Sequence, residues 1–133
     1  MRNMKMRILQ VVVLAAVLYG LHYYIEYAAY QKAISKIEIT DTTAEGVPDG
    51  TYEGSSDTGF VRASVEVTVK NEEITDIRLV EHINERGKKA ETVIDEVKQK
   101  QTTKVETVSG ATNSSRVILE AIQRALEEGK ENE

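Results

Sequence analysis

The clearest pattern along the chain is a strict alternation of apolar and polar residues from Phe60 to Lys70. From Val61 onward every second residue is Val or Ala, and the residues between them are charged or carry a hydroxyl. A period of two with β-branched residues is typical of a strand that buries one face. After a turn at Asn71-Glu72-Glu73, the segment from Ile74 to Val80 returns as a second strand. The pattern therefore predicts an antiparallel hairpin.

Two later segments have apolar residues at helical spacing. The first runs from about Lys88 to Gln101, and the second from about Ser115 to Glu128, where Gly129 is expected to end the helix. A short strand at 51–53 precedes the hairpin. This order of elements predicts an α+β fold, in which a small antiparallel sheet packs with two amphipathic helices. A doubly wound sheet is disfavoured, because the chain lacks both a Gly-x-Gly-x-x-Gly turn and regular βαβ alternation.

The N-terminal 30 residues have a different pattern. Ile8 to Ile25 is a run of 18 residues without Asp, Glu, Lys or Arg, and as a helix it would measure about 27 Å, close to the thickness of a bilayer's hydrocarbon core. Four tyrosines gather where this helix would leave the lipid, as in an interfacial aromatic belt: Tyr23, Tyr24, Tyr27 and Tyr30. We therefore expect residues 1–30 to form a short N-terminal tip and one transmembrane helix.

The flanking charges predict the orientation of this anchor. Arg2, Lys5 and Arg7 precede the apolar run, and the positive-inside rule then places the N-terminus in the cytoplasm and the remaining chain outside the cell membrane. The alternative is a cleaved signal peptide, which also begins with basic residues. Its apolar region is normally only about 7–15 residues long. We therefore favour an uncleaved, single-pass anchor.

Composition divides the rest of the chain. Residues 31–48 include a run of Thr, Asp, Glu and Gly and the only proline, Pro48, which is typical of a polar tether. The apolar residues of its first part, Lys32 to Ile39, are also compatible with an extension of the preceding helix. The globular domain is expected over 49–129, and the tail over 130–133 is expected to fray. From Gln31 onward the chain has 14 Lys or Arg and 21 Asp or Glu residues. This negative charge argues against nucleic acid as a partner. The absence of Cys excludes disulfides and iron–sulfur clusters.

The candidate chemistry lies in the turn that precedes the final helix. Gly110 permits a positive φ, and its small neighbours Ser109 and Ala111 allow a bulky group to approach the backbone. The first turn of the helix offers N–H groups without intrahelical partners, and the helix dipole favours an anion there. Further hydroxyl donors would come from Thr112, Ser114 and Ser115. These features are compatible with a phosphate site, but taken alone they favour a simple helix cap.

A resemblance to a known family favours the phosphate site. The chain contains, in order, Asp49-Gly50-Thr51-Tyr52-Glu53-Gly54, the alternating strand, the hairpin ending in Ile74-Thr75-Asp76-Ile77, the pair Glu81-His82, an amphipathic helix and Ser109-Gly110-Ala111-Thr112. This ordered set resembles the FMN-binding domain family, whose members occur in subunits of sodium-translocating NADH:quinone reductase and of related electron-transfer complexes. The likeness covers nearly all of the outer domain.

The resemblance implies a cofactor and a residue that carries it. In that family the last Thr of the motif is esterified to the phosphate of FMN, so Thr112 is the expected attachment site. Ser109, Gly110 and Ala111 would shape its turn. A separate flavin transferase, with FAD as donor, would move FMN onto the Thr112 hydroxyl. Glu106 stands where the family usually has Asp, three residues before the Ser.

The loop after the hairpin offers further candidates. The family often has Glu-Thr-Pro-Gly there, whereas this chain has Glu85-Arg86-Gly87. By the resemblance Glu85 and Gly87 would border the flavin ring, and Arg86 would contact a phosphate or the ring carbonyls. The alternative is a solvated charged loop. His82 is expected on the surface at a strand end. A metal role is not supported, because no second His or Cys nearby would complete a ligand set.

Three hypotheses for function follow. The first is a membrane-anchored extracytoplasmic flavoprotein that relays electrons between a membrane donor and an external acceptor, as a redox carrier or oxidoreductase subunit and not as a complete enzyme. The second is a non-redox membrane-tethered module that binds FMN or another phosphate ligand reversibly. The third is a purely structural domain whose turn only caps a helix.

Overall fold

A three-stranded antiparallel sheet forms the centre of the domain. The computed structural model describes residues 2–83 and 88–131, and its strands are β1 (Gly50–Asp57), β2 (Arg62–Lys70) and β3 (Glu73–Ile83). The strands are joined in the order β1-β2-β3, so each pairs with its neighbour in sequence. The predicted hairpin is confirmed in β2 and β3. The first strand is longer than the predicted 51–53, because it pairs with β2 along its whole length.

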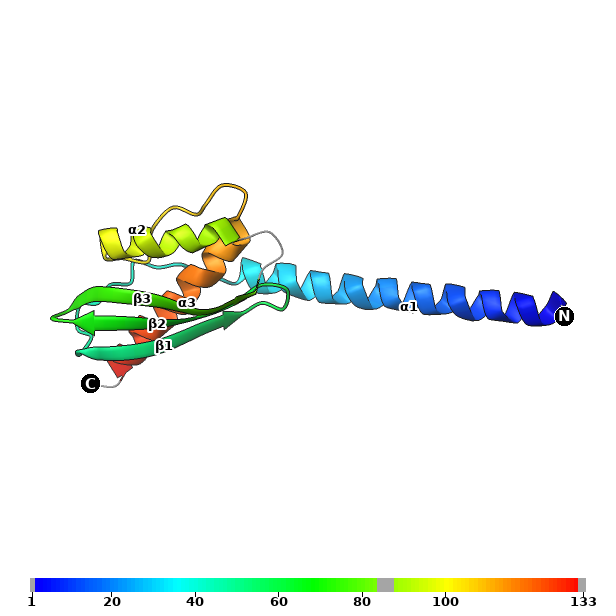
Figure 1. The fold of residues 1–133 in the computed structure, drawn as a ribbon, viewed down its shortest axis with the longest axis horizontal. Coiled ribbons are helices and arrows are strands. Elements are labelled where there is room, and N and C mark those ends of the chain that lie inside the picture. Colours follow the sequence, from blue (N-terminus) through cyan, green and yellow to red (C-terminus); the bar gives the residue numbers. More distant parts are fainter. Residues whose placement is uncertain (1, 84–87, 132–133) are drawn as a thin grey trace.

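Helix α3 (Thr112–Glu131) crosses one face of the sheet and contacts β1 and β2 (Figure 1). The apolar face of β2 is buried against it, as the alternation predicted. The buried residues of that strand are Ala63, Val65, Val67 and Val69, and they meet a stripe of α3 that includes Val117, Ile118, Ile122 and Leu126. The predicted fold class, an α+β sandwich of a small antiparallel sheet and amphipathic helices, is confirmed.

The helix predicted over 88–101 is divided into two parts. A short 3-10 helix, η1 (Lys88–Thr92), leads directly into α2 (Val93–Lys100), which contacts β3 and α3. Gln101 ends α2 in the left-handed conformation, with φ of 58°. Its side chain pairs with the backbone of Ile74 on β3, donating from Nε2 to the carbonyl oxygen at 3.0 Å and accepting from the amide at 2.7 Å. This pairing fixes the end of α2 to the sheet.

The prediction that Gly129 ends the final helix is wrong. Helix α3 continues through Gly129 to Glu131. The glycine serves close packing instead, because a Cβ at this position would lie 2.6 Å from Val47 Cγ1 and 3.0 Å from the Tyr52 ring. The contact lets the end of the helix lie directly against the segment that precedes β1.

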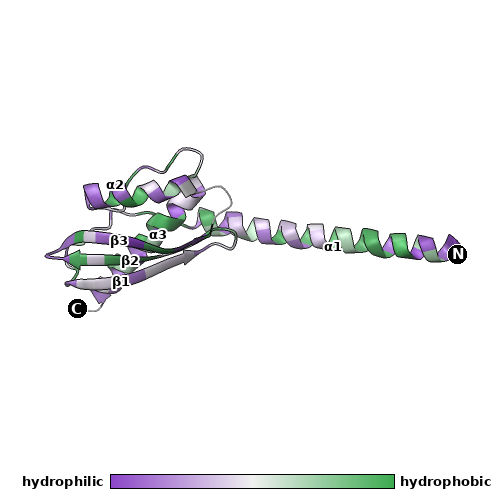
Figure 2. Ribbon diagram, viewed as in Figure 1, coloured by the Kyte–Doolittle hydropathy of each residue, from purple (hydrophilic) through white to green (hydrophobic). Residues whose placement is uncertain are grey.

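Helix α1 (Arg2–Ser35) extends far from the domain as a single rod (Figure 1). By length and composition it is able to cross a membrane, with a mean hydropathy of 1.9 in its most apolar window, none of which is buried. Figure 2 shows the apolar residues concentrated in the half of α1 that lies away from the domain. The other end of the helix belongs to the domain, where Tyr30 and Ile34 are buried.

The segment predicted as a polar tether is helical at its start and packed on the domain over the rest. Its first residues continue α1 to Ser35. The remainder is irregular but packs on the domain, and Ile37, Ala44 and Val47 are part of the buried core. The buried Thr103 side chain accepts a hydrogen bond from the Thr42 amide at 3.2 Å. The chain therefore passes from α1 into the domain without a free linker, because its scattered apolar residues have a core to enter.

Candidate functional site

The Ser-Gly-Ala-Thr motif forms a tight turn that leads into α3. The Ala111 amide donates to the Val108 carbonyl at 2.9 Å, which closes the turn. Gly110 has φ of 79°, a conformation that side chains with a Cβ rarely adopt. The prediction of a positive-φ glycine at this position is therefore confirmed.

Thr112 is the first residue of α3, and its side chain is exposed, as is that of Ser109. The helix begins three residues earlier than predicted, so the hydroxyl of Thr112 lies at the helix terminus itself. The helix is 20 residues long. Its first amides have no intrahelical acceptors, and its dipole places partial positive charge at this end. A phosphate ester on Thr112 would lie where the backbone stabilises negative charge.

The structure gives Ser115 a different role from the one predicted. Its side chain is fully buried, and its hydroxyl donates to the Ala111 carbonyl at 2.7 Å and accepts from the Val108 amide at 3.0 Å. A hydroxyl has only one proton to donate, so Ser115 is not available as a phosphate donor. It holds the two ends of the turn together. Ser114 is also buried, at 5% exposure.

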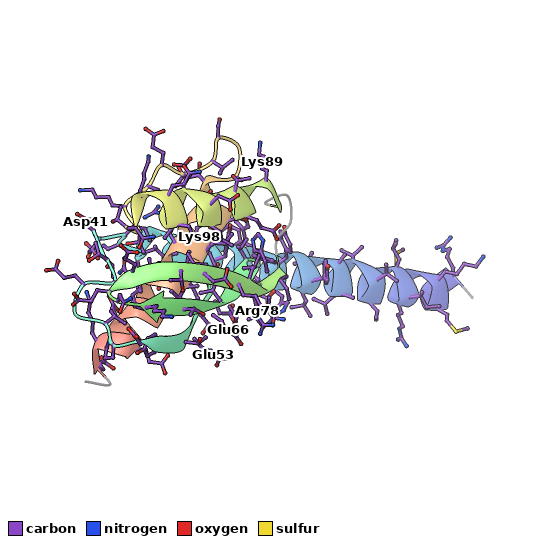
Figure 3. All side chains as sticks on the ribbon, turned by 60° about the vertical axis from the view of Figure 1, so that its left-hand side comes forward. Asp41, Glu53, Glu66, Arg78, Lys89 and Lys98 are labelled. Atoms are coloured by element: carbon purple, nitrogen blue, oxygen red, sulfur yellow. The ribbon has the colours of Figure 1, made fainter. Side chains whose placement is uncertain are left out.

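The side chain of Lys89, a residue that the sequence did not single out, lies beside the turn. A Cβ on Gly110 would lie only 2.7 Å from Lys89 Nζ, which places this ammonium group directly over the glycine. Lys89 belongs to η1 (Figure 3), and η1 contacts α3. No spacing rule connects residues 89 and 110, so only the tertiary fold reveals this neighbour.

His82 is not the surface residue that the sequence suggested. Its side chain is 2% exposed, and its Nδ1 lies 3.2 Å from Glu91 Oε1. Because Glu91 belongs to η1, this contact ties the end of β3 to the short helix that carries Lys89. His82 therefore supports the position of η1 beside the turn.

The start of α3 is also joined to the end of α1. Asn113 Nδ2 donates to Tyr30 Oη at 3.1 Å, and Arg116 Nη2 donates to the Ile37 carbonyl at 2.6 Å. The Tyr30 ring packs edge-on against Phe60, with ring centroids 5.6 Å apart. A pocket of about 410 Å³ lies between α1 and the β1–β2 loop, with Tyr30 and Phe60 in its wall. The turn thus lies at the end of the domain from which α1 projects (Figure 1).

The other predicted site residues are placed as follows. Ala111 is buried below the turn, whereas Glu106 is exposed on the segment that leads into it. Glu85, Arg86 and Gly87 lie outside the described residues. The structure thus brings Ser109, Gly110 and Thr112 together at an exposed helix terminus, with Lys89 added and Ser115 removed from the set of candidate ligand contacts.

Comparison with known families decides the assignment. The model of the FMN-binding domain matches residues 59–127. The chain belongs to the FMN-binding domain family. The match begins in the β1–β2 loop and ends within α3, so it includes the whole Ser-Gly-Ala-Thr turn. No curated protein matches the chain. The resemblance expected from the ordered motifs is therefore confirmed, and FMN is the cofactor that this FMN-binding domain is suited to hold.

Proposed function

We propose that this FMN-binding domain carries FMN as a phosphoester on Thr112 and relays electrons outside the cell membrane, to which α1 anchors it. The observation that supports this most directly is the exposed Thr112 side chain at the first position of α3. An attachment residue must be reachable by a second protein while the domain is folded. Thr112 meets that requirement, whereas the buried hydroxyls of Ser114 and Ser115 do not.

The residues around Thr112 are suited to a phosphate diester. The amides of the first turn of α3 and the Lys89 ammonium group would both stabilise its negative charge. The absence of a side chain on Gly110 leaves room for Lys89 to lie over the turn. Ser109 adds an exposed hydroxyl on the same turn. The chain thus offers charge, donors and space at one place.

The attachment reaction would be a phosphoryl transfer by a separate flavin transferase. Thr112 Oγ1 forms a bond to the FMN phosphorus of FAD, the pyrophosphate bond breaks, and AMP leaves while the hydroxyl proton is released. A covalent bond suits a domain outside the cytoplasm, because a dissociated cofactor would be lost to dilution there. Glu106, exposed ahead of the turn, keeps the negative charge that the family motif usually has at this position.

As a flavoprotein the chain would act as a redox carrier or as a subunit of an oxidoreductase. FMN supplies the electron-transfer chemistry, and the protein supplies binding, orientation and tuning. The anchor would keep the carrier beside a membrane electron donor, and the outer domain would meet an extracytoplasmic acceptor. The long apolar α1 supports the first half of this arrangement. The orientation is supported by Arg2, Lys5 and Arg7 ahead of the apolar run.

The test is the intact mass of the full-length chain, purified in detergent after co-expression with an active flavin transferase. We expect an added mass of one FMN less one water, and a flavin colour that survives denaturation. Thr112→Val preserves the side-chain shape and should abolish the adduct, whereas Ser109→Ala should retain it. An adduct that persists in Thr112→Val and is lost in Ser109→Ala would move the attachment to Ser109. Colour that is lost on denaturation would instead support reversible binding of the flavin.

A further inference from the structure

An aromatic cluster joins the β1–β2 loop to the outer end of α1. Phe60, in that loop, lies 5.7 Å from the Tyr23 ring, 6.3 Å from Tyr27 and 5.6 Å from Tyr30, measured between ring centroids. Tyr23 and Tyr27 also stack on each other at 6.4 Å. Despite these contacts, Tyr23 remains 48% exposed and Tyr27 43% exposed. The cluster therefore presents aromatic surface outward.

The position of this cluster along α1 relates it to the bilayer. Tyr23 lies within the uncharged run that ends at Ile25, and its neighbour Tyr24 is 68% exposed. If α1 crosses the membrane with this run in the hydrocarbon, Tyr23 lies at the outer boundary of the lipid. Tyr27 follows one turn later, at about 6 Å. Phe60 contacts both, so the loop that carries it lies at the depth of the lipid head groups.

We propose that the aromatic cluster of Tyr23, Tyr27 and Phe60 is a membrane-contact surface, which holds the domain directly on the bilayer. The partner is the interfacial layer of the membrane that α1 crosses, where aromatic side chains are favoured. The inference rests on the anchoring role of α1, but not on the presence of FMN. With this contact in place, the domain would not move freely at a distance from the membrane.

The charges beside the cluster indicate which lipids this surface suits. Glu26 and Asp57 both line the pocket next to Phe60. Arg62, at the start of β2, forms an ion pair with Glu81 at 3.0 Å. Excess negative charge is repelled by anionic head groups, whose attraction requires clustered Lys or Arg. The contact is therefore apolar and aromatic, and it should form on zwitterionic lipid alone.

This contact would also determine the height of the candidate attachment site. Tyr30 follows Tyr23 by seven residues, which corresponds to about 10 Å along a helix. Its hydroxyl accepts from Asn113, the residue after Thr112. The Ser-Gly-Ala-Thr turn would therefore lie only about 10 Å beyond the lipid boundary. A group attached there would be presented to components embedded in the membrane.

The chain contains no tryptophan, so Phe60→Trp would introduce a single fluorescent reporter. The full-length variant is reconstituted into phosphatidylcholine vesicles whose acyl chains are brominated near the head-group end. Tyr24→Trp reports whether α1 lies in the bilayer, and Thr75→Trp, on the exposed surface of β3, reports the domain away from α1. We expect Phe60→Trp to be quenched at least half as strongly as Tyr24→Trp, and Thr75→Trp to be unaffected.

Quenching of Tyr24→Trp without quenching of Phe60→Trp would overturn the contact while leaving the anchor intact. Loss of both signals would overturn the anchor as well, and neither result would bear on the FMN adduct, which the intact mass measures separately. Quenching that appears only after anionic lipid is added would contradict the apolar contact. A second variant, Asp57→Cys, leaves Phe60 unchanged. Because the chain has no cysteine, a spin label would attach at this position alone. If the loop lies on the bilayer, the label should be more accessible to oxygen than to a water-soluble nickel complex.

Discussion

Replacement of Ser115 by Ala tests whether one buried hydroxyl holds the attachment turn together. The Ser115 hydroxyl links Ala111 and Val108, at 2.7 Å and 3.0 Å, across the residues that form the turn. Alanine keeps the helix propensity and removes only the oxygen. The Val108 amide, in a partly buried environment, would then lose its acceptor.

The expected cost follows from these two hydrogen bonds. Each contributes about 1 kcal/mol net, and the part-buried Val108 amide can still reach water once its acceptor is gone, so no further penalty is added. Ser115→Ala should therefore lower the free energy of unfolding of the domain by about 2 kcal/mol. With a slope of about 2 kcal/mol per molar urea, the unfolding midpoint would fall by about 1 M.

The assay is urea unfolding of the full-length protein in mild detergent, followed by near-ultraviolet circular dichroism of the tyrosines. Thr112→Val is the matched control, because its exposed side chain should change stability by less than about 0.5 kcal/mol. The two variants should behave oppositely with the transferase: Ser115→Ala keeps the acceptor hydroxyl, and Thr112→Val lacks it. A Ser115→Ala midpoint equal to that of the parent protein would refute the structural role assigned to this hydroxyl.

Two further predictions concern packing and charge. Gly54→Ala should destabilise the domain by at least about 3 kcal/mol in the same urea assay, because its Cβ would overlap backbone atoms of α3. The control is Gly59→Ala, whose Cβ would meet no atom of the described residues within 4 Å and which should cost only about 1 kcal/mol of backbone strain. Equal losses of stability in the two variants would refute the close approach of β1 and α3. Lys89→Gln should slow flavin incorporation several-fold at low salt and make its rate less salt-dependent, as measured by in-gel flavin fluorescence. The control is Lys104→Gln, which replaces an exposed lysine on another segment. An equal effect in both variants would show that only the net charge of the domain matters.

The sequence was sufficient for the elements whose signal is local. The alternation over β2 predicted both the strand and the face that packs on α3, because burial on a sheet follows a period of two. The turn with Gly110 was also predictable, since few residues other than glycine adopt its backbone conformation. Membership of the FMN-binding domain family was likewise evident from the order of short motifs.

The errors concern residues whose roles depend on how the chain folds around them. Gly129 has the same local signal as a helix-ending glycine, but Val47 requires it to be small. Ser115 resembles an available hydroxyl until the turn folds back and occupies it. Lys89 is one lysine among many until η1 places it over Gly110. The Gly129 and Lys89 contacts join elements that no local spacing connects, whereas the partners of Ser115 lie four and seven residues away and are set by how the turn closes.

The packing of residues 36–48 on the last helix has a consequence for the order in which the domain folds. The Thr40 amide donates to Gln123 Oε1, 83 residues later in the chain, and the Ile37 carbonyl accepts from Arg116, 79 residues later. Bonds of such high contact order form late. If the chain beyond the anchor crosses a membrane as it is synthesised, the segment next to the anchor crosses first and must wait for α3 before it finds its partners. The domain would then complete its folding only after nearly the whole chain has been translocated. This order is compatible with an export route that carries the polypeptide across the membrane in an unfolded state.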